Sequence, residues 1–177
     1  MKRATLFCCP ISEIPIRFAC CIAVILFTAP AFAAVTVGNE DIEPPAMAET
    51  PCHERPFSVL LTVQNVKDGR GLITADMHDN NPDRWLKGGQ HLVRVRVPAV
   101  KGETKMCVPV AAAGTYAIAI YHDKNANRHF DKNFLGLPAE PYGISNNPPI
   151  NFGPPSLEES AFKVEGPLTP MIIRLKP

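Results

Sequence analysis

The sequence predicts an all-β protein, a single antiparallel β-sandwich of about seven strands with one long ordered loop. Short stretches that alternate apolar and polar residues recur over residues 57–177, which is the pattern of strands with one buried face. Turn-forming Gly, Pro and Asn residues separate these stretches, and no segment shows a sustained helical period. A closed barrel is the alternative architecture for the same pattern.

Residues 1–33 have the features of a signal peptide. A basic front that includes Arg17 precedes an apolar run over residues 18–32, which is short for a membrane span, and the small-x-small motif AFA follows it. An uncleaved membrane anchor is the alternative. We therefore expect export to the periplasm or the extracellular space, with no stable membrane anchor after cleavage.

The charge balance does not indicate a polyanionic partner. The chain has 18 Lys and Arg residues against 17 Asp and Glu residues, a formal net charge of +1, and no run of basic residues. Nucleic acid and anionic membrane surfaces are therefore poor candidates for partners, because both are recognised through concentrated positive charge. The sequence indicates no other partner.

Two cysteines, Cys52 and Cys107, remain when residues 1–33 are removed. In an exported chain, two cysteines most simply form one disulfide bond, here between Cys52 and Cys107. The competing interpretations are a metal pair and a reactive thiol. His53 beside Cys52 still leaves a metal site short of ligands.

Residues 34–56 are rich in Pro, Glu, Ala and Thr with little periodicity, so they are interpreted as a flexible lead-in to a domain over residues 57–177. The predicted strands of that domain are, in order, 57–66, 71–77, 91–97, 104–110, 115–122, 161–165 and 170–175. A capping-box pattern from Ser156 to Glu159 predicts one helical turn before the last two strands.

Alternation and turn residues justify these strands one by one. The first strand places Val59, Leu61 and Val63 on one face, and a Lys-Asp-Gly turn leads from it to the second. The third alternates valine with Arg94 and Arg96, so we expect its charged side chains to point away from the core. The fourth carries the second cysteine, and the fifth follows Ala-Gly and alternates large apolar residues with alanine. Pro and Gly residues lie next to the ends of the last two predicted strands.

The connection between His122 and Ala161 contains six prolines and three glycines. An irregular connection of this length in a compact domain indicates either an error in the assignment or a functional loop. Its apolar residues suggest a loop that packs on itself and on the sandwich; they are Phe134, Leu135, Leu137, Tyr142, Ile144, Ile150 and Phe152.

The start of this loop, HDKNANRHFDKN at residues 122–133, has the spacing of a calcium loop. Helical calcium loops supply oxygens from positions 1, 3, 5, 7 and 9 and a bidentate carboxylate from position 12. The ligands predicted here are Asp123, Asn125, Asn127, the backbone carbonyl of His129 and Asp131, with Glu140 as the additional carboxylate. Phe130 matches the apolar residue that anchors such loops inward.

Two positions depart from the calcium pattern. Arg128 stands where glycine allows the positive-φ turn, and Phe134 stands where the bidentate carboxylate is expected. Few carboxylates and several nearby basic residues predict weak binding, in the roughly millimolar range of extracellular modules. The alternative is a tight turn in which Asp and Asn side chains satisfy the backbone themselves. A transition-metal site through His122 and His129 is a third interpretation, without a close ligand pair.

The chain resembles the DUF2141 family, exported bacterial proteins of unassigned function. The resemblance rests on YAIAIYHD at 116–123, the Asn-x-Asn and Asp-x-Asn pairs after it, FLGLPAEPYGISN at 134–146, FGPP at 152–155 and AF at 161–162. It implies one β-sandwich similar to prealbumin-like and carboxypeptidase-regulatory-like modules, with the long loop as part of the domain and no known activity. Arg128 departs from the glycine usual in the family.

Three classes of function follow from these residues. The first is an exported, non-catalytic module whose loop is stiffened by its prolines and by calcium. The second is a carbohydrate- or peptide-binding module that presents Trp85 and Tyr142. The third, and least supported, is a hydrolase that uses the 122–162 loop, because no arrangement of nucleophile, base and orienting group can be identified around Ser145.

Overall fold

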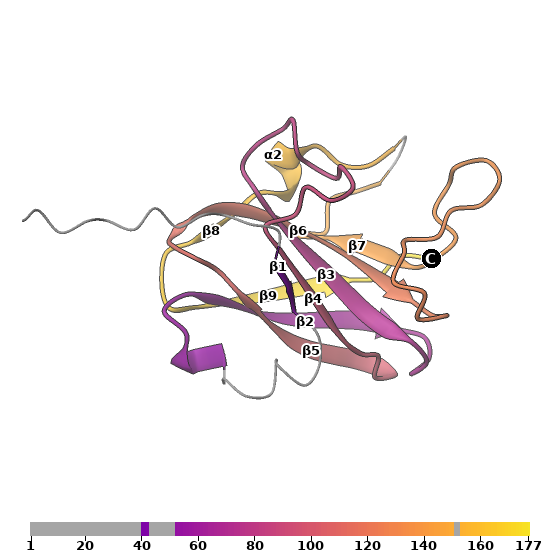
Figure 1. Ribbon diagram of the computed structural model, residues 1–177, viewed down its shortest axis with the longest axis horizontal. Helices are drawn as coiled ribbons and strands as arrows, with labels where there is room; N and C mark the ends of the chain where they lie inside the picture. Colours follow the sequence, from indigo (N-terminus) through magenta and orange to yellow (C-terminus); the bar gives the residue numbers. More distant parts are fainter. Residues whose placement is uncertain (1–39, 43–51, 151–152) are drawn as a thin grey trace, which may run out of the picture. The chain divides into compact units, whose positions relative to one another are not determined.

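The computed structural model describes residues 40–42, 52–150 and 153–177, all within one compact unit, Thr36–Pro177. These residues form two β-sheets that pack together, so the predicted all-β sandwich is confirmed (Figure 1). The predicted signal peptide, residues 1–33, lies outside the described residues, as does most of the predicted lead-in. No helix in the described part of the chain has the length and apolar character needed to cross a membrane.

The described residues form nine strands and two short helical turns. In chain order these elements are β1 (Glu40–Ile42), the 3-10 turn η1 (Cys52–Glu54), β2 (Ser58–Val66), β3 (Leu72–Asp79), β4 (Val93–Pro98), β5 (Gly102–Pro109), β6 (Gly114–Asp123), β7 (Tyr142–Ile144), α2 (Leu157–Ser160), β8 (Phe162–Val164) and β9 (Leu168–Arg174). All seven predicted strands are present, with bounds that differ by a few residues.

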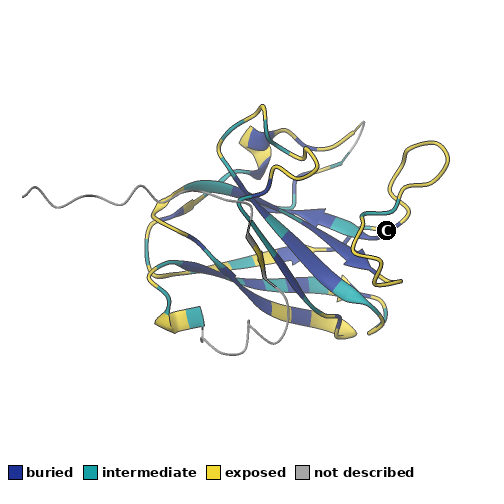
Figure 2. Ribbon diagram, viewed as in Figure 1, coloured by how far each residue is buried: buried dark blue, intermediate teal, exposed yellow. Residues whose placement is uncertain are grey.

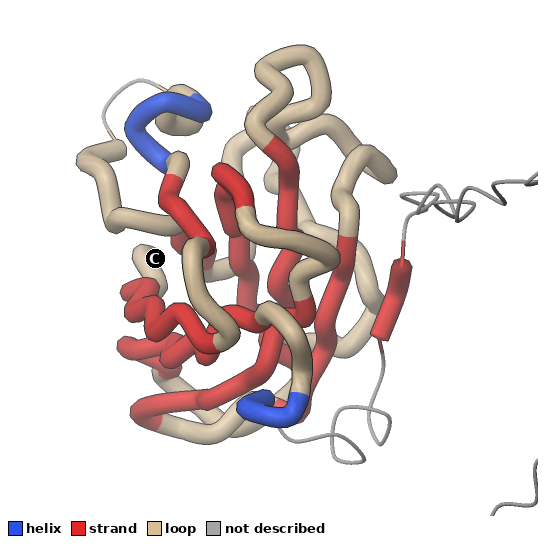
Figure 3. Tube along the Cα trace, turned by 90° about the vertical axis from the view of Figure 1, so that its left-hand side faces the viewer, coloured by secondary structure: helices blue, strands red, loops and turns tan. Residues whose placement is uncertain are grey.

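The strands are divided into a larger and a smaller sheet. The larger sheet has the order β1-β4-β3-β6-β7, and β8 also pairs with β6; the smaller sheet has the order β5-β2-β9. Most neighbouring strands are antiparallel, as expected, and the two parallel pairs are β1 with β4 and β2 with β9. Figure 3 shows β1 at the edge of the larger sheet, with α2 and η1 well apart from each other.

The hydrophobic core lies between the two sheets. Val59, Leu61 and Val63 of β2 are fully buried, as their alternation predicts, and Ile118 and Ile120 of β6 are buried in the same core. Burying a side chain of this size stabilises the fold by about 1.5–3 kcal/mol relative to leaving it exposed. The faces that the sequence marks as apolar therefore do hold the sheets together.

Two strands were not predicted, and both are three residues long. β1 lies within the stretch interpreted as a lead-in, and β7 lies within the long loop. Three residues are too few to show alternation, so only their pairing with a neighbouring strand defines them. The predicted helical turn is confirmed as α2, and both hydrogen bonds of the capping box between Ser156 and Glu159 are present.

The predicted disulfide bond is also confirmed. Cys52 in η1 and Cys107 in β5 are bonded, with their Cα atoms 5.4 Å apart. The bond closes a long stretch of chain that contains β2, β3 and β4. It therefore restricts the unfolded chain in the region that forms the middle of both sheets.

Removing this disulfide is expected to lower the free energy of unfolding by about 4 kcal/mol, the entropic estimate for a closed loop of this length. The measurement is urea unfolding of the wild type with and without reductant. The double variant C52S/C107S is the control, because reductant has no bond to break in it. An oxidised and a reduced wild type of equal stability would contradict the expectation.

Gly71, between β2 and β3, allows the chain to pass close to the end of β6. Its φ is +74°, and a Cβ atom added there would lie 1.9 Å from the backbone oxygen of Asp123. Both the positive φ and this approach require glycine. The backbone at Asp123, where the candidate calcium loop begins, is therefore packed directly against this turn.

Gly71→Ala is expected to destabilise the protein by about 3 kcal/mol or more, because positive-φ strain adds to a clash with backbone that cannot move aside. Gly88→Ala is a matched control, since a Cβ atom there would meet nothing within 4 Å. The control should change the free energy of unfolding by less than about 0.5 kcal/mol. Chemical denaturation of both variants tests the difference, and equal effects would refute it.

Candidate functional site

Strand β6 brings Asp123 to the first position of the candidate calcium loop. The Asp123 side chain is buried, and Leu72 of β3 is its cross-strand partner. Its Oδ1 accepts a hydrogen bond from the amide of Asn127 at 3.1 Å, and its Oδ2 accepts one from the amide of Arg128 at 2.7 Å. The carboxylate thus bends the following residues back around itself.

The two asparagines of the loop continue this curvature. The Oδ1 of Asn125 accepts from the amide of Asn127 at 3.1 Å, and the Oδ1 of Asn127 accepts from the amide of His129 at 2.8 Å. Both Nδ2 groups donate to the carboxylate of Asp131. These bonds hold the pKa of Asp131 below its usual value, with Asn127 the larger cause.

Backbone strain accompanies the tight loop. Arg128 has a φ of +66°, as expected for the position where glycine is usual, and Ala126 has a φ of +55°. Each costs about 1 kcal/mol or more for a residue with a Cβ atom. The hydrogen bonds to Asp123 and the asparagines offset this cost, so the loop keeps its tight turn without a glycine at position 128.

A hairpin with its tip at residues 133–137 follows this loop, and Glu140 comes after the hairpin. The side chain of Glu140 lies back against the loop. The side chain is buried, its Oε1 accepts from the amide of Lys124 and its Oε2 accepts from the amide of Asp131, both at 3.1 Å. Burial raises the pKa of Glu140, the two backbone bonds oppose that rise, and the negative charges of Asp123 and Asp131 add to it. The structure therefore brings the predicted additional carboxylate to the loop.

Phe130 anchors the loop to the sheet, as its position predicts. Its ring centroid lies 5.3 Å from that of Tyr121 and 6.1 Å from that of Tyr142. Tyr142, considered above as a ligand-binding residue, is half-buried in this aromatic contact. Trp85 lies elsewhere, with its ring 5.2 Å from His78 and its Nε1 donating to the Pro155 carbonyl at 3.0 Å.

The oxygens of the loop match a hard cation better than a transition metal. The carboxylate oxygens of Asp123 and Glu140 and the Oδ1 of Asp131 each accept one hydrogen bond and retain a further lone pair, whereas the Oδ2 of Asp131 accepts two hydrogen bonds. Across residues 40–42, 52–150 and 153–177, no three His, Cys, Asp or Glu side chains are grouped to hold a metal ion, so any ligand set here must include amide and backbone oxygens. Buried His122 contacts the Arg70 carbonyl through Nε2 at 2.7 Å, whereas His129 is exposed.

The side chain of Ser145 is hydrogen-bonded to two backbone groups. Its buried hydroxyl donates to the Ser160 carbonyl at 2.5 Å and accepts from the amide of Ile118 at 3.0 Å. A hydroxyl that donates to one backbone group and accepts from another joins α2 to β6. No nucleophile, base and orienting group are needed to explain its position.

The expectation that the apolar residues of the loop pack on the sandwich is wrong for three of them. Phe134, Leu135 and Leu137 are 95%, 67% and 57% exposed, whereas Ile144 is buried as expected. Ile144 lies in β7, which pairs with β6, but residues 133–137 form the tip of a hairpin. Phe152 lies outside the described residues.

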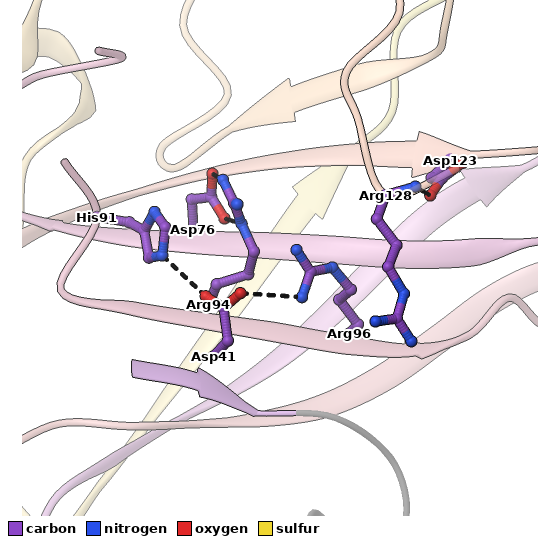
Figure 4. A network of polar contacts seen from close by, with 7 residues as sticks. All are labelled: Asp41, Asp76, His91, Arg94, Arg96, Asp123 and Arg128. Atoms are coloured by element: carbon purple, nitrogen blue, oxygen red, sulfur yellow. Dashed lines mark hydrogen bonds and ion pairs between the residues drawn. The ribbon is translucent and has the colours of Figure 1, made fainter. Parts of the chain in front are cut away.

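Sequence patterns missed a charged network on β3, β4 and β1 (Figure 4). The Nε and Nη2 of Arg94 donate to the two oxygens of Asp76, each at 2.6 Å, which raises the pKa of Arg94. Asp41 contacts His91 at 3.0 Å and Arg96 at 3.3 Å. Burial alone would raise the pKa of Asp41, but the bonds to His91 and Arg96 together lower it. Arg96 was expected to be exposed, and it is buried.

The imidazole of His78 lies against the ring of Trp85, and its burial predicts that the free energy of unfolding depends on pH. Burial lowers the pKa of His78, and the charge of Asp76 only partly opposes this. A folded pKa below the unfolded value near 6.5 gives stability that is present above about pH 6.5 and lost as the pH falls below it.

We expect His78→Phe to reduce the loss of unfolding free energy between about pH 7.5 and about pH 5.5, because phenylalanine keeps a ring against Trp85 and does not titrate. Urea unfolding at the two pH values measures the loss. His53→Phe is the control, since the side chain of His53 is exposed. If His78→Phe keeps the wild-type pH dependence, burial of the imidazole has no such effect.

Comparison with known proteins supports the family resemblance. The model of DUF2141, described as an uncharacterized protein conserved in bacteria, matches residues 61–171. Comparison with curated proteins and with solved structures found no match. The matched residues run from β2 to β9 and include the whole candidate calcium loop and the hairpin behind it. The chain therefore belongs to the DUF2141 family.

Proposed function

We propose that this chain is an exported, non-catalytic β-sandwich module that presents its loop from His122 to Phe162 for binding, and that calcium stiffens the start of that loop. The proposed ligands are oxygens of Asp123, Asn125, Asn127, the His129 carbonyl, Asp131 and Glu140. Calcium takes roughly six to eight oxygens in a flexible geometry, which suits such a mixed set.

The observation that carries this proposal is the position of Glu140. A buried carboxylate that accepts from the amides of Lys124 and Asp131 lies against both ends of the Asp123–Asp131 turn. Its raised pKa reflects unfavourable burial of charge and the nearby charges of Asp123 and Asp131. A divalent cation among these carboxylates would relieve both effects, because it compensates the negative charge locally.

The same geometry supports weak binding. The carboxylates of the described residues form no group of three that could hold a metal ion, so the proposed set depends on neutral oxygens as well. The asparagine oxygens are partly used by backbone amides, and Lys124, Arg128 and Lys132 are nearby in sequence. Low ligand charge weakens calcium affinity toward the roughly millimolar range. Calcium is therefore proposed as a stabiliser at extracellular concentrations.

A non-catalytic role is supported by the surroundings of the candidate catalytic and sugar-binding groups. The hydroxyl of Ser145 is bonded to backbone on both sides, and the indole N–H of Trp85 is bonded to Pro155. Both side chains thus stabilise the connections around α2. The proposed module binds through its loop and does not require a reaction at Ser145 or a sugar contact at Trp85.

Calcium is expected to raise the unfolding temperature relative to chelator, by the equivalent of about 2.7 kcal/mol when its concentration is 100 times the dissociation constant. Asp131→Asn should abolish most of this shift, since it removes a charge with little change of shape. Asp83→Asn is the matched control at an exposed site outside the loop. Calorimetry of the three proteins in calcium and in chelator measures the shifts.

An absent shift at about 100 mM calcium, roughly 100 times a millimolar dissociation constant, would overturn the calcium proposal and leave the loop held by its own hydrogen bonds. A shift that Asp83→Asn reduces as much as Asp131→Asn would place calcium elsewhere on the protein.

A further inference from the structure

The hairpin that follows the candidate calcium loop exposes an apolar tip, which we define as Phe134, Leu135 and Leu137. Their exposed fractions are 95%, 67% and 57%. The hairpin projects from the sandwich near the end of β6, and its tip is coloured as exposed (Figures 1 and 2). Large apolar side chains gathered on a projecting segment are typical of a surface that becomes covered in a complex or in a membrane.

The hairpin backbone is hydrogen-bonded to itself. The amide of Asn133 donates to the Leu137 carbonyl at 2.8 Å, and the amide of Gly136 donates to the Asn133 carbonyl at 2.9 Å. The Oδ1 of Asn133 accepts from the amides of Leu135 and Leu137 at 3.0 and 3.1 Å. Four amides of the tip therefore have partners within the hairpin, which reduces the cost of placing it in a medium without hydrogen-bonding groups.

Basic residues occur along the loop that leads into the hairpin. Lys124, Arg128 and Lys132 are exposed, at steps of four residues along the loop. Three carboxylates belong to the same loop and hairpin. Asp123 and Glu140 are buried and accept from backbone amides, and Asp131 is half-buried and accepts from the side-chain amides of Asn125 and Asn127. Composition gave no reason to expect an anionic surface as a partner, because the chain is nearly neutral. The fold, however, buries two of the three carboxylates of this loop and hairpin and leaves the three basic side chains exposed.

We propose that this hairpin binds an anionic phospholipid surface, with the apolar tip inserted among the acyl chains and the basic residues at the headgroups. The apolar tip corresponds to the acyl-chain layer of a lipid leaflet, and the basic residues correspond to the headgroup layer. A projecting, convex tip with its own backbone hydrogen bonds suits a fluid lipid layer. The proposal builds on the binding role given above to the loop and does not require calcium.

Vesicle flotation of the full chain in chelator tests this proposal, so that its failure and that of the calcium proposal are separate. The probes are vesicles of phosphatidylcholine alone and vesicles in which about one third of the lipid is phosphatidylglycerol. We expect binding to the anionic vesicles, weakened about tenfold or more in F134S/L137S. Val100→Ser is the matched control, because Val100 is also 57% exposed but lies between β4 and β5.

The double variant K124E/K132E tests the headgroup contact, and it should bind the two kinds of vesicle equally weakly. The control is K87E/K101E, at exposed lysines of other turns, which should bind as the wild type does. All proteins carry the same N terminus, so any contribution of residues 1–33 is common to them. Circular dichroism confirms that each variant is folded.

Insertion is tested locally with Phe134→Trp in a Trp85→Phe background. Its emission should shift to shorter wavelength with anionic vesicles and be quenched by lipids brominated on their acyl chains. Absence of wild-type binding to anionic vesicles would overturn the proposal. So would equal binding by F134S/L137S and the wild type, or an unchanged emission at position 134, since each would show that the tip stays in water.

Discussion

The structure depends on the hydrogen bonding of one strand, β6, along both of its edges. β3 pairs with one edge from Tyr116 to Asp123, while the other edge is shared by β7 near Tyr121 and by β8 near Thr115. Between these two short strands, the hydroxyl of Ser145 accepts from the amide of Ile118, and the amide of Ser145 donates to the Ile118 carbonyl. Buried backbone N–H and C=O groups require hydrogen-bond partners, so the chain after the start of the loop pairs with the second edge of β6 at two places.

That requirement shapes the loop and closes the sandwich. The loop forms β7 where it returns to β6, and β8 follows directly after the loop. Tyr142 of β7 exchanges backbone hydrogen bonds with Lys176 after β9. Asn147 binds the edge of β9 through the Ile172 carbonyl and the Arg174 amide. The loop therefore connects the two sheets as well as covering an edge, and it lies within the residues that the family model matches.

Outside these returns, the loop satisfies its polar groups without the sheets. Asp123, Asn125, Asn127 and Glu140 accept from backbone amides at the base, and Asn133 does the same at the tip. A segment that supplies its own hydrogen bonds need not pack on the core, so Phe134 and its apolar neighbours are free to project. The carboxylates of the base and the apolar tip are thus parts of one self-supporting structure, which the calcium and lipid proposals use at different places.

The sequence by itself determined the features that depend on local pattern. Alternation over 57–66 and 115–122 identified core strands, the Ser156–Glu159 pattern identified α2, and the Asp and Asn spacing identified a tight loop with a positive φ at Arg128. Only the tertiary structure decided which strands are neighbours, that Arg96 is buried with Asp41, and that Phe134 is exposed. These outcomes depend on contacts between residues far apart in the chain, which neither alternation nor spacing encodes, since the same local pattern permits many pairings.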